Sequence, residues 1–148
     1  MAYMQVKEVL QRAGAFHARL ADAYRWIAER ASREEKKQML AYMAEQEEDA
    51  RRMLDEYVRT SQSQALETWL HFIPPTTLQL SDMPRPDMEL DELVASASKL
   101  DQSLTTLYDR LATYTAAPGT QEALGRLRDL QREKERKLSK AALLEDLV

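Results

Sequence analysis

Apolar residues recur at steps of three and four along four long segments of this chain. The first stripe consists of Val6, Val9, Ala13, Phe16, Leu20, Tyr24, Ile27 and Ala31. This spacing places apolar side chains on one face of an α-helix. Glycine (3) and proline (5) are scarce among the 148 residues, whereas a β domain needs such residues at its many turns. The sequence therefore predicts one all-α domain of four long helices.

The four segments are expected to pair as two helix hairpins joined by one long crossover. The hairpins cover residues 3–62 and 87–146, and the crossover covers residues 63–86, where most of the prolines lie. A connection of this length is uncommon in a compact domain unless it travels along the bundle. The expected order of helix directions is therefore up, down, down, up.

Helix starts are predicted from capping residues. Ser32, followed three residues later by Glu35, fits a capping box. Asp87 is the expected N-cap of the third helix, and Thr120, after a Pro-Gly pair, is that of the fourth. The apolar stripe expected in the fourth helix includes Leu124, Leu127, Leu130 and Leu138.

The two predicted hairpins align with each other. A shift of 84 residues matches residues 17–54 to 101–138 without a gap, with six identities that include Tyr24 and Tyr108. The apolar stripes keep one register throughout, so we interpret the chain as an internal repeat. The alternative is that any two amphipathic hairpins align in this way.

The helices resemble those of rubrerythrin-like members of the ferritin-like superfamily. In that family a metal-binding Glu precedes a Tyr by seven residues, as His17 precedes Tyr24 and Asp101 precedes Tyr108 in this chain. Residues 43–54 resemble the family's Glu-x-x-His helix. The resemblance covers nearly the whole chain and implies a ferritin-like four-helix bundle, in which two hairpins are joined by one crossover.

The metal-ligand positions implied by this resemblance have changed. A ferritin-like di-metal centre takes one Glu from each of two helices and a Glu-x-x-His from each of the other two. At these six positions the resemblance places His17, Glu47, Ala50, Asp101, Gln131 and Lys134. A register shifted by one residue on the second and fourth helices gives Gln46, Asp49, Leu130 and Glu133. Neither register keeps a Glu-x-x-His.

Helical geometry favours the first register, because Glu47 and Ala50 fall within the arc set by the apolar residues around them. We therefore expect a buried polar centre, made of His17, Glu47, Asp101, Gln131 and Lys134, with Tyr24 and Tyr108 close by. We predict that the Lys134 ammonium replaces the metal and pairs with the carboxylates, because buried charges must be paired. The alternatives are that Lys134 extends to solvent along an apolar stem, that Glu47 belongs to a solvated acidic face, and that His17 is a hydrogen-bonded core residue.

Three functions follow from these residues. The leading hypothesis is a non-catalytic ferritin-like protein without an intact di-metal centre or cofactor, acting as a binding or oligomeric interaction module. The second is a carboxylate-bridged iron or manganese oxidase or peroxide-handling protein. Its unorthodox ligands would be His17, Glu47, Asp49, Asp101 and Glu133. The third is a small-molecule binder that uses the polar centre.

Composition limits the partners. The absence of cysteine excludes disulfides, thiolate metal sites and thiol catalysis, and two histidines make a hydrolytic triad improbable. A net charge of -4 does not suggest nucleic acid or an anionic membrane, and no run of apolar residues is long enough to cross a membrane. We expect a cytoplasmic homodimer, with an unidentified protein partner as a further possibility. The expected dimer contacts are Trp26, Leu143, Leu144, Leu147 and Val148.

Overall fold

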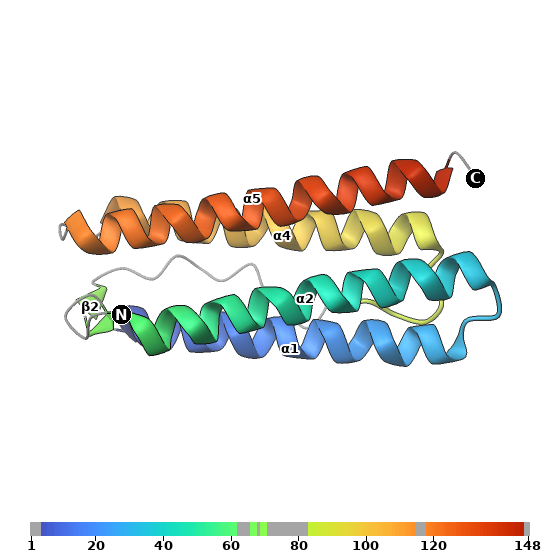
Figure 1. The fold of residues 1–148 in the computed structure, drawn as a ribbon, viewed down its shortest axis with the longest axis horizontal. Coiled ribbons are helices and arrows are strands. Elements are labelled where there is room, and N and C mark those ends of the chain that lie inside the picture. Colours follow the sequence, from blue (N-terminus) through green and yellow to red (C-terminus); the bar gives the residue numbers. More distant parts are fainter. Residues whose placement is uncertain (1–3, 62–65, 68, 71–82, 115–117, 147–148) are drawn as a thin grey trace.

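Four long helices form the bundle described by the computed structural model, which covers residues 4–61, 66–67, 69–70, 83–114 and 118–146. These helices are α1 (Val6–Arg30), α2 (Glu34–Thr60), α4 (Leu90–Tyr114) and α5 (Pro118–Asp146). Figure 1 shows α1 beside α2 and α4 beside α5, with the two pairs packed along their length. The predicted all-α four-helix fold is therefore confirmed.

The helix directions follow the order up, down, down, up. Helix α2 ends at the end of the bundle where α1 begins, and α4 starts at the opposite end (Figure 1). The chain between Ser61 and Met83 therefore joins opposite ends of the bundle. Most of the predicted crossover, residues 63–86, lies outside the described residues.

A short strand pair closes one end of the first hairpin. Strand β1 (Met4–Gln5) pairs antiparallel with strand β2 (Trp69–Leu70). The Gln5 side-chain amide also donates to the Glu67 carbonyl oxygen at 3.3 Å. These bonds fix the start of α1 to the chain that follows α2.

The predicted N-cap at Ser32 is wrong. Helix α2 begins at Glu34, and its N-cap is Arg33, which makes no side-chain capping bond. Residues 31–33 span only a short extended link between two long helices. The link is as short as predicted, and it makes α1 and α2 an antiparallel hairpin.

The predicted N-caps of the other hairpin are also wrong. Helix α4 starts after Glu89, whose backbone N–H donates to the Glu92 carboxylate at 3.3 Å, while Asp87 accepts from Arg85. Helix α5 starts at Pro118, because a helix's first turn does not need the N–H that proline lacks. Thr120 lies inside that helix and is buried.

The core consists of two apolar clusters separated by a polar layer. One cluster contains Leu10, Leu54, Leu104 and Leu127, and the other contains Leu20, Met43, Leu100 and Leu138. Between them along the four helices lie the buried residues His17, Glu47, Asp101 and Gln131. Apolar burial, about 1.5–3 kcal/mol for each large side chain, therefore acts on both sides of one buried polar layer.

None of the described helices has the length and apolar character needed to cross a membrane.

Candidate functional site: a buried polar centre

One polar residue from each helix is buried at the middle of the bundle. His17 lies on α1, Glu47 on α2, Asp101 on α4 and Gln131 on α5, and each is at most 5% exposed. Lys134 follows Gln131 by three residues, so both side chains leave the same face of α5. The structure thus brings together the five polar side chains that the first register places in the polar centre.

Lys134 connects the two hairpins. Its ammonium donates to Glu47 Oε1 on α2 at 2.7 Å and to Asp101 Oδ1 on α4 at 2.5 Å. Its side chain is only 10% exposed. Lys134 therefore does not extend to solvent, and one cation serves two buried carboxylates from different hairpins.

A neighbour within its own hairpin holds each carboxylate in place. His17 Nδ1 on α1 lies 2.5 Å from Glu47 Oε2, and Gln131 Nε2 on α5 donates to Asp101 Oδ1 at 2.7 Å. Hydrogen bonds to a charged group are stronger than neutral ones, and buried charges need such partners. Glu47 therefore does not belong to the solvated acidic face.

The charges of the polar centre determine its protonation. Burial raises the pKa of Glu47, but the Lys134 ammonium and His17 outweigh burial and hold that pKa below its ordinary value. Burial lowers the pKa of Lys134, yet Glu47 and Asp101 together raise it above its ordinary value. The pair of Glu47 and Lys134 is therefore ionised at neutral pH.

Asp101 differs from Glu47. Burial raises the pKa of Asp101 to about 6, because the attraction of Lys134 is smaller than the cost of burial and the charge of Glu47 adds to that cost. Its second oxygen, Oδ2, is buried and has no hydrogen-bond partner among the described residues. Asp101 is therefore the carboxylate of the polar centre that is easier to protonate.

Two buried tyrosine hydroxyls are also without partners in the described part of the chain, those of Tyr24 and Tyr108. Burial raises the pKa of both phenols, and the charges of Glu47 and Asp101 raise that of Tyr24 further. Buried polar atoms are usually hydrogen-bonded to protein or water. Each hydroxyl is thus neutral and has capacity for a hydrogen bond that the described residues do not supply.

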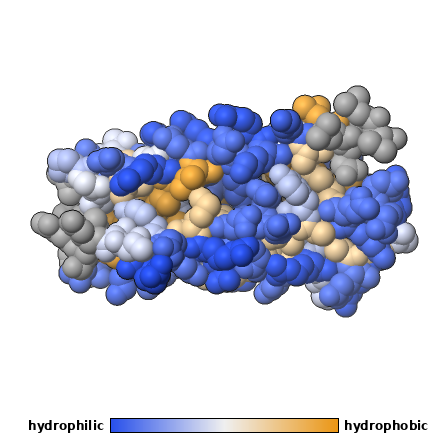
Figure 2. All heavy atoms as spheres, viewed as in Figure 1, coloured by the Kyte–Doolittle hydropathy of each residue, from blue (hydrophilic) through white to orange (hydrophobic). Residues whose placement is uncertain are grey.

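A cavity of about 460 Å³ reaches the polar centre between α2 and α5. Its lining includes His17, Tyr108 and Lys134 from the bundle interior and Met53 and Leu130, which are exposed. Figure 2 shows apolar atoms gathered on the surface between α5 and α2, within a largely hydrophilic face. The polar centre is therefore connected to the surface on this side.

The sequence reasoning missed the outer part of this cavity. Leu130 belongs to the predicted apolar stripe of α5 but is exposed, and Met53 is exposed opposite it on α2. Leu130 is adjacent to the polar-centre residue Gln131, and this is the sequence signal that it lies at the edge of the stripe. An empty volume has no sequence signal of its own.

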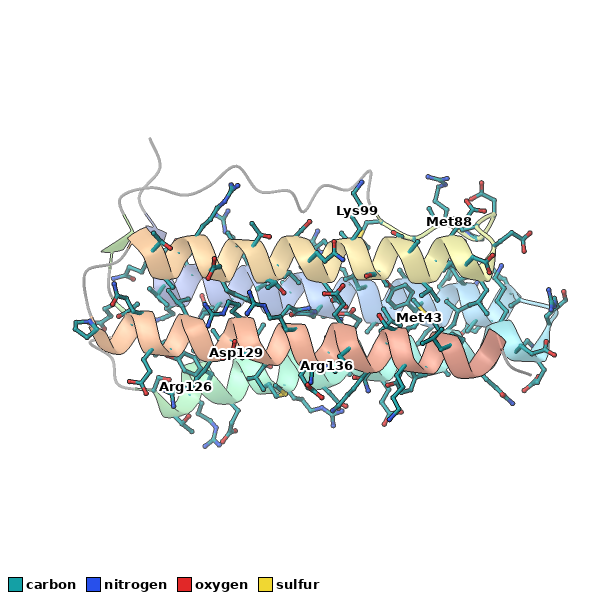
Figure 3. All side chains as sticks on the ribbon, turned by 90° about the horizontal axis from the view of Figure 1, so that it is seen from above. Met43, Met88, Lys99, Arg126, Asp129 and Arg136 are labelled. Atoms are coloured by element: carbon teal, nitrogen blue, oxygen red, sulfur yellow. The ribbon has the colours of Figure 1, made fainter. Side chains whose placement is uncertain are left out.

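The shifted register is not the one in the structure. Asp49 is 48% exposed and accepts from Arg52, and Glu133 is 47% exposed and accepts from Arg136. Figure 3 shows Arg126, Asp129 and Arg136 in order along α5, on the helix that carries Glu133. Both carboxylates are therefore half exposed and paired with arginines at the edge of the cavity, outside the buried polar centre.

The residues of the polar centre do not fit two divalent cations. A ferritin-like di-metal centre uses four carboxylates and two imidazoles, whereas this centre has two carboxylates and one imidazole, with an ammonium bonded to both carboxylates. Within the residues that the structure describes, no group of three or more His, Cys, Asp or Glu side chains is arranged to hold a metal ion.

Comparisons with known proteins agree with the fold. No protein-family model matches the chain, and no curated protein matches it. A crystal structure from Thermotoga maritima, provisionally named a ferritin-like diiron-carboxylate protein, is similar with a TM-score of 0.61 and 20% sequence identity, covering 95% of each chain. At this identity the likeness concerns the fold. The chain thus has the ferritin-like four-helix fold.

Proposed function

We propose that this ferritin-like chain is a non-catalytic binding module, in which the Lys134 ammonium takes the place of the metal ions. The observation that supports it is the position of Lys134 Nζ, 2.7 Å from Glu47 and 2.5 Å from Asp101. These two carboxylates stand at inherited ligand positions, and each is bonded to the same cation. A divalent cation at this place would meet the repulsion of the ammonium.

The hydrogen bonds of Glu47 also favour a structural rather than a catalytic role for this residue. Both oxygens of Glu47 are engaged, one by Lys134 and one by His17. A general base needs a substrate proton within reach, and Glu47 has no free oxygen for one. Lys134 thus couples the two hairpins, and its remaining N–H donor and the cavity beside it are left for binding.

Metal uptake tests this proposal. The purified chain is incubated anaerobically with iron(II) or manganese(II), freed of unbound metal and assayed by elemental analysis. We expect no stoichiometric metal. Stoichiometric iron or manganese that is lost in Asp101→Asn and Glu47→Gln would contradict the proposal and support the oxidase alternative.

A matched control rebuilds the ligand set. The triple variant Ala50→His, Gln131→Glu, Lys134→His restores Glu-x-x-His on both α2 and α5. We expect it to take up metal under the conditions in which the natural chain does not, because it removes the ammonium and adds one carboxylate and two imidazoles. If neither the natural chain nor the triple variant takes up metal, the assignment of positions 50, 131 and 134 to the polar centre is wrong.

We also propose that the chain forms a homodimer through the last turns of α5. Leu143 is 65% exposed there, and Trp26 of α1 is 46% exposed with the Arg30 guanidinium over its ring at 3.9 Å. The side chains of Leu144, Leu147 and Val148 lie outside the described residues. Sedimentation at micromolar concentration should give the mass of a dimer that Leu143→Glu dissociates, and a monomeric natural chain would contradict this.

A further inference from the structure

The cavity between α2 and α5 lies beside a small residue, Ala50. Ala50 lines it, three residues after Glu47. The residue that the 84-residue shift matches to Ala50 is Lys134, whose side chain occupies a much larger volume. An alanine methyl group leaves most of that volume unfilled, and neighbouring side chains close such a gap only in part.

Hydrogen-bond donors lie at the inner end of this cavity. The Tyr108 hydroxyl is buried and has no partner among the described residues. The Lys134 ammonium has three N–H donors, and its bonds to Glu47 and Asp101 account for two of them. Both residues line the cavity, so its inner end suits an oxygen atom that accepts hydrogen bonds.

Apolar side chains line the path from the inner end to the surface. They are Leu54 and Leu127, which are buried, and Met53 and Leu130, which are exposed. The cavity of about 460 Å³ thus combines an apolar strip with polar and charged side chains, and its size suits a small organic ligand.

Three of the four charged residues at the mouth, Asp49, Arg52 and Glu133, bond to their own neighbours, and the fourth is the exposed Lys137. Arg52 donates to Asp49 at 2.6 Å, and Arg136 donates to Glu133 at 2.8 Å. Inside, Lys134 already serves two carboxylates. A third carboxylate beside Glu47 and Asp101 would add negative charge where one ammonium already serves two carboxylates, which is unfavourable in a medium of low dielectric constant. A neutral acceptor avoids this cost.

We propose that this cavity binds an uncharged amphipathic molecule, with a carbonyl oxygen that accepts from Lys134 and Tyr108 and an apolar ring or chain along Leu54, Leu127, Met53 and Leu130. This ligand class rests on the proposed metal-free centre, because a metal ion would displace the Lys134 ammonium.

The test compares three probes of one shape. 2-Acetonaphthone has a carbonyl, 2-naphthoate has a carboxylate, and naphthalene has no acceptor. Each is titrated into the full chain by ligand-observed NMR with chelator present. We expect 2-acetonaphthone to bind more tightly than either of the others. Equal or tighter binding of naphthoate or naphthalene, or no binding of 2-acetonaphthone, would overturn the proposal.

Three variants locate the site. Ala50→Leu fills the cavity and should abolish 2-acetonaphthone binding, with thermal melting to check that it folds. Tyr108→Phe removes one hydrogen bond and should weaken binding about 5-fold. Tyr24→Phe is the matched control, since Tyr24 is an equally buried tyrosine that does not line the cavity, and its affinity should be that of the natural chain.

The variants also separate this proposal from the proposed function. Unchanged binding in both Ala50→Leu and Tyr108→Phe, or an equal loss in Tyr24→Phe and Tyr108→Phe, would overturn the assignment of the site. These results do not depend on metal uptake, which is measured in a separate experiment without chelator. A chain that takes up stoichiometric metal therefore refutes the metal-free centre, whereas failed probe binding refutes the ligand site.

Discussion

Each hairpin contributes one carboxylate to the same buried layer, but the carboxylate lies on the second helix of one hairpin and on the first helix of the other. In the first hairpin the carboxylate stands on the second helix, as Glu47, and its partner His17 stands on the first. In the second hairpin the carboxylate stands on the first helix, as Asp101, and its partner Gln131 stands on the second. Two carboxylates thus lie on different helices, where a single cation reaches both.

The hairpins differ most three residues after Glu47 on α2 and three residues after Gln131 on α5. This residue is Ala50 in the first hairpin and Lys134 in the second. The ammonium of one hairpin neutralises carboxylates of both, and the methyl group of the other leaves a cavity beside it. Two different residues at positions matched by the 84-residue shift therefore have two effects: one places a cation between the buried carboxylates, and the other leaves space that reaches the surface.

The largest expected effect comes from making the second hairpin like the first. Lys134→Ala leaves Glu47 and Asp101 buried without their cation, and breaking a buried ion pair in this way costs about 3–5 kcal/mol. Urea unfolding at neutral pH measures the loss. The control is Lys137→Ala. Lys137 is exposed and lies about one helical turn after Lys134, so its loss should change stability by at most about 0.5 kcal/mol. Equal effects of the two substitutions would show that Lys134 carries no buried pairing.

The two carboxylates should also differ in the sign of their pH dependence. Asp101 has an ordinary pKa of 3.8 and a pKa of about 6 in the folded protein, so its proton is held more tightly in the folded state. Its contribution to stability is present below about pH 4 and is lost as the pH rises through about 6, and it amounts to about 3 kcal/mol. Relative to Asp101→Asn, the natural chain should therefore lose stability from pH 4 to 7.

Glu47 gives the opposite sign. Its pKa is lowered in the folded protein by Lys134 and His17, which outweigh burial. Its contribution to stability is present above its ordinary pKa of 4.5 and is lost as the pH falls below it. The free energy of unfolding of Glu47→Gln and of Asp101→Asn, measured against pH, gives both signs. The same pH dependence in the two variants would contradict the predicted difference between the two carboxylates.

The smallest effect is expected at the two tyrosines. Tyr24 and Tyr108 occupy equivalent positions, and neither hydroxyl has a partner among the described residues. Removing a buried hydroxyl that makes no protein hydrogen bond should change stability by less than about 1 kcal/mol in either variant, Tyr24→Phe or Tyr108→Phe. Thermal unfolding without added ligand measures this, and a loss of several kcal/mol would mean that the hydroxyls are bonded within the protein.

Much of the fold was predictable because apolar spacing alone determines which helix faces are buried. The stripe that contains Leu20 and Tyr24 is buried as predicted. Helix starts were less predictable. Ser32, Asp87 and Thr120 are all plausible caps by residue type, yet the helices begin at Glu34, at Leu90 after the bond of the Glu89 N–H to Glu92, and at Pro118.

The grouping of polar residues was predictable for a different reason. Three- and four-residue spacing places Glu47 on the inner face of α2 and Lys134 on that of α5, whatever their chemistry. The higher pKa of Asp101 and the free hydroxyl of Tyr108 were not predictable, because both depend on the distances between side chains of different helices. The cavity beside Ala50 depends on how far α2 and α5 approach each other.

The ionisation of Lys134 tests the central claim most directly. Lysine side chains labelled with ¹³C are followed by NMR while the pH is raised. Although burial lowers the pKa of Lys134, the charges of Glu47 and Asp101 raise it above the ordinary value. One lysine signal, absent in Lys134→Ala, should therefore titrate at higher pH than the exposed lysines and shift in Asp101→Asn. A Lys134 signal that titrates with the exposed lysines would contradict an ammonium held between two buried carboxylates.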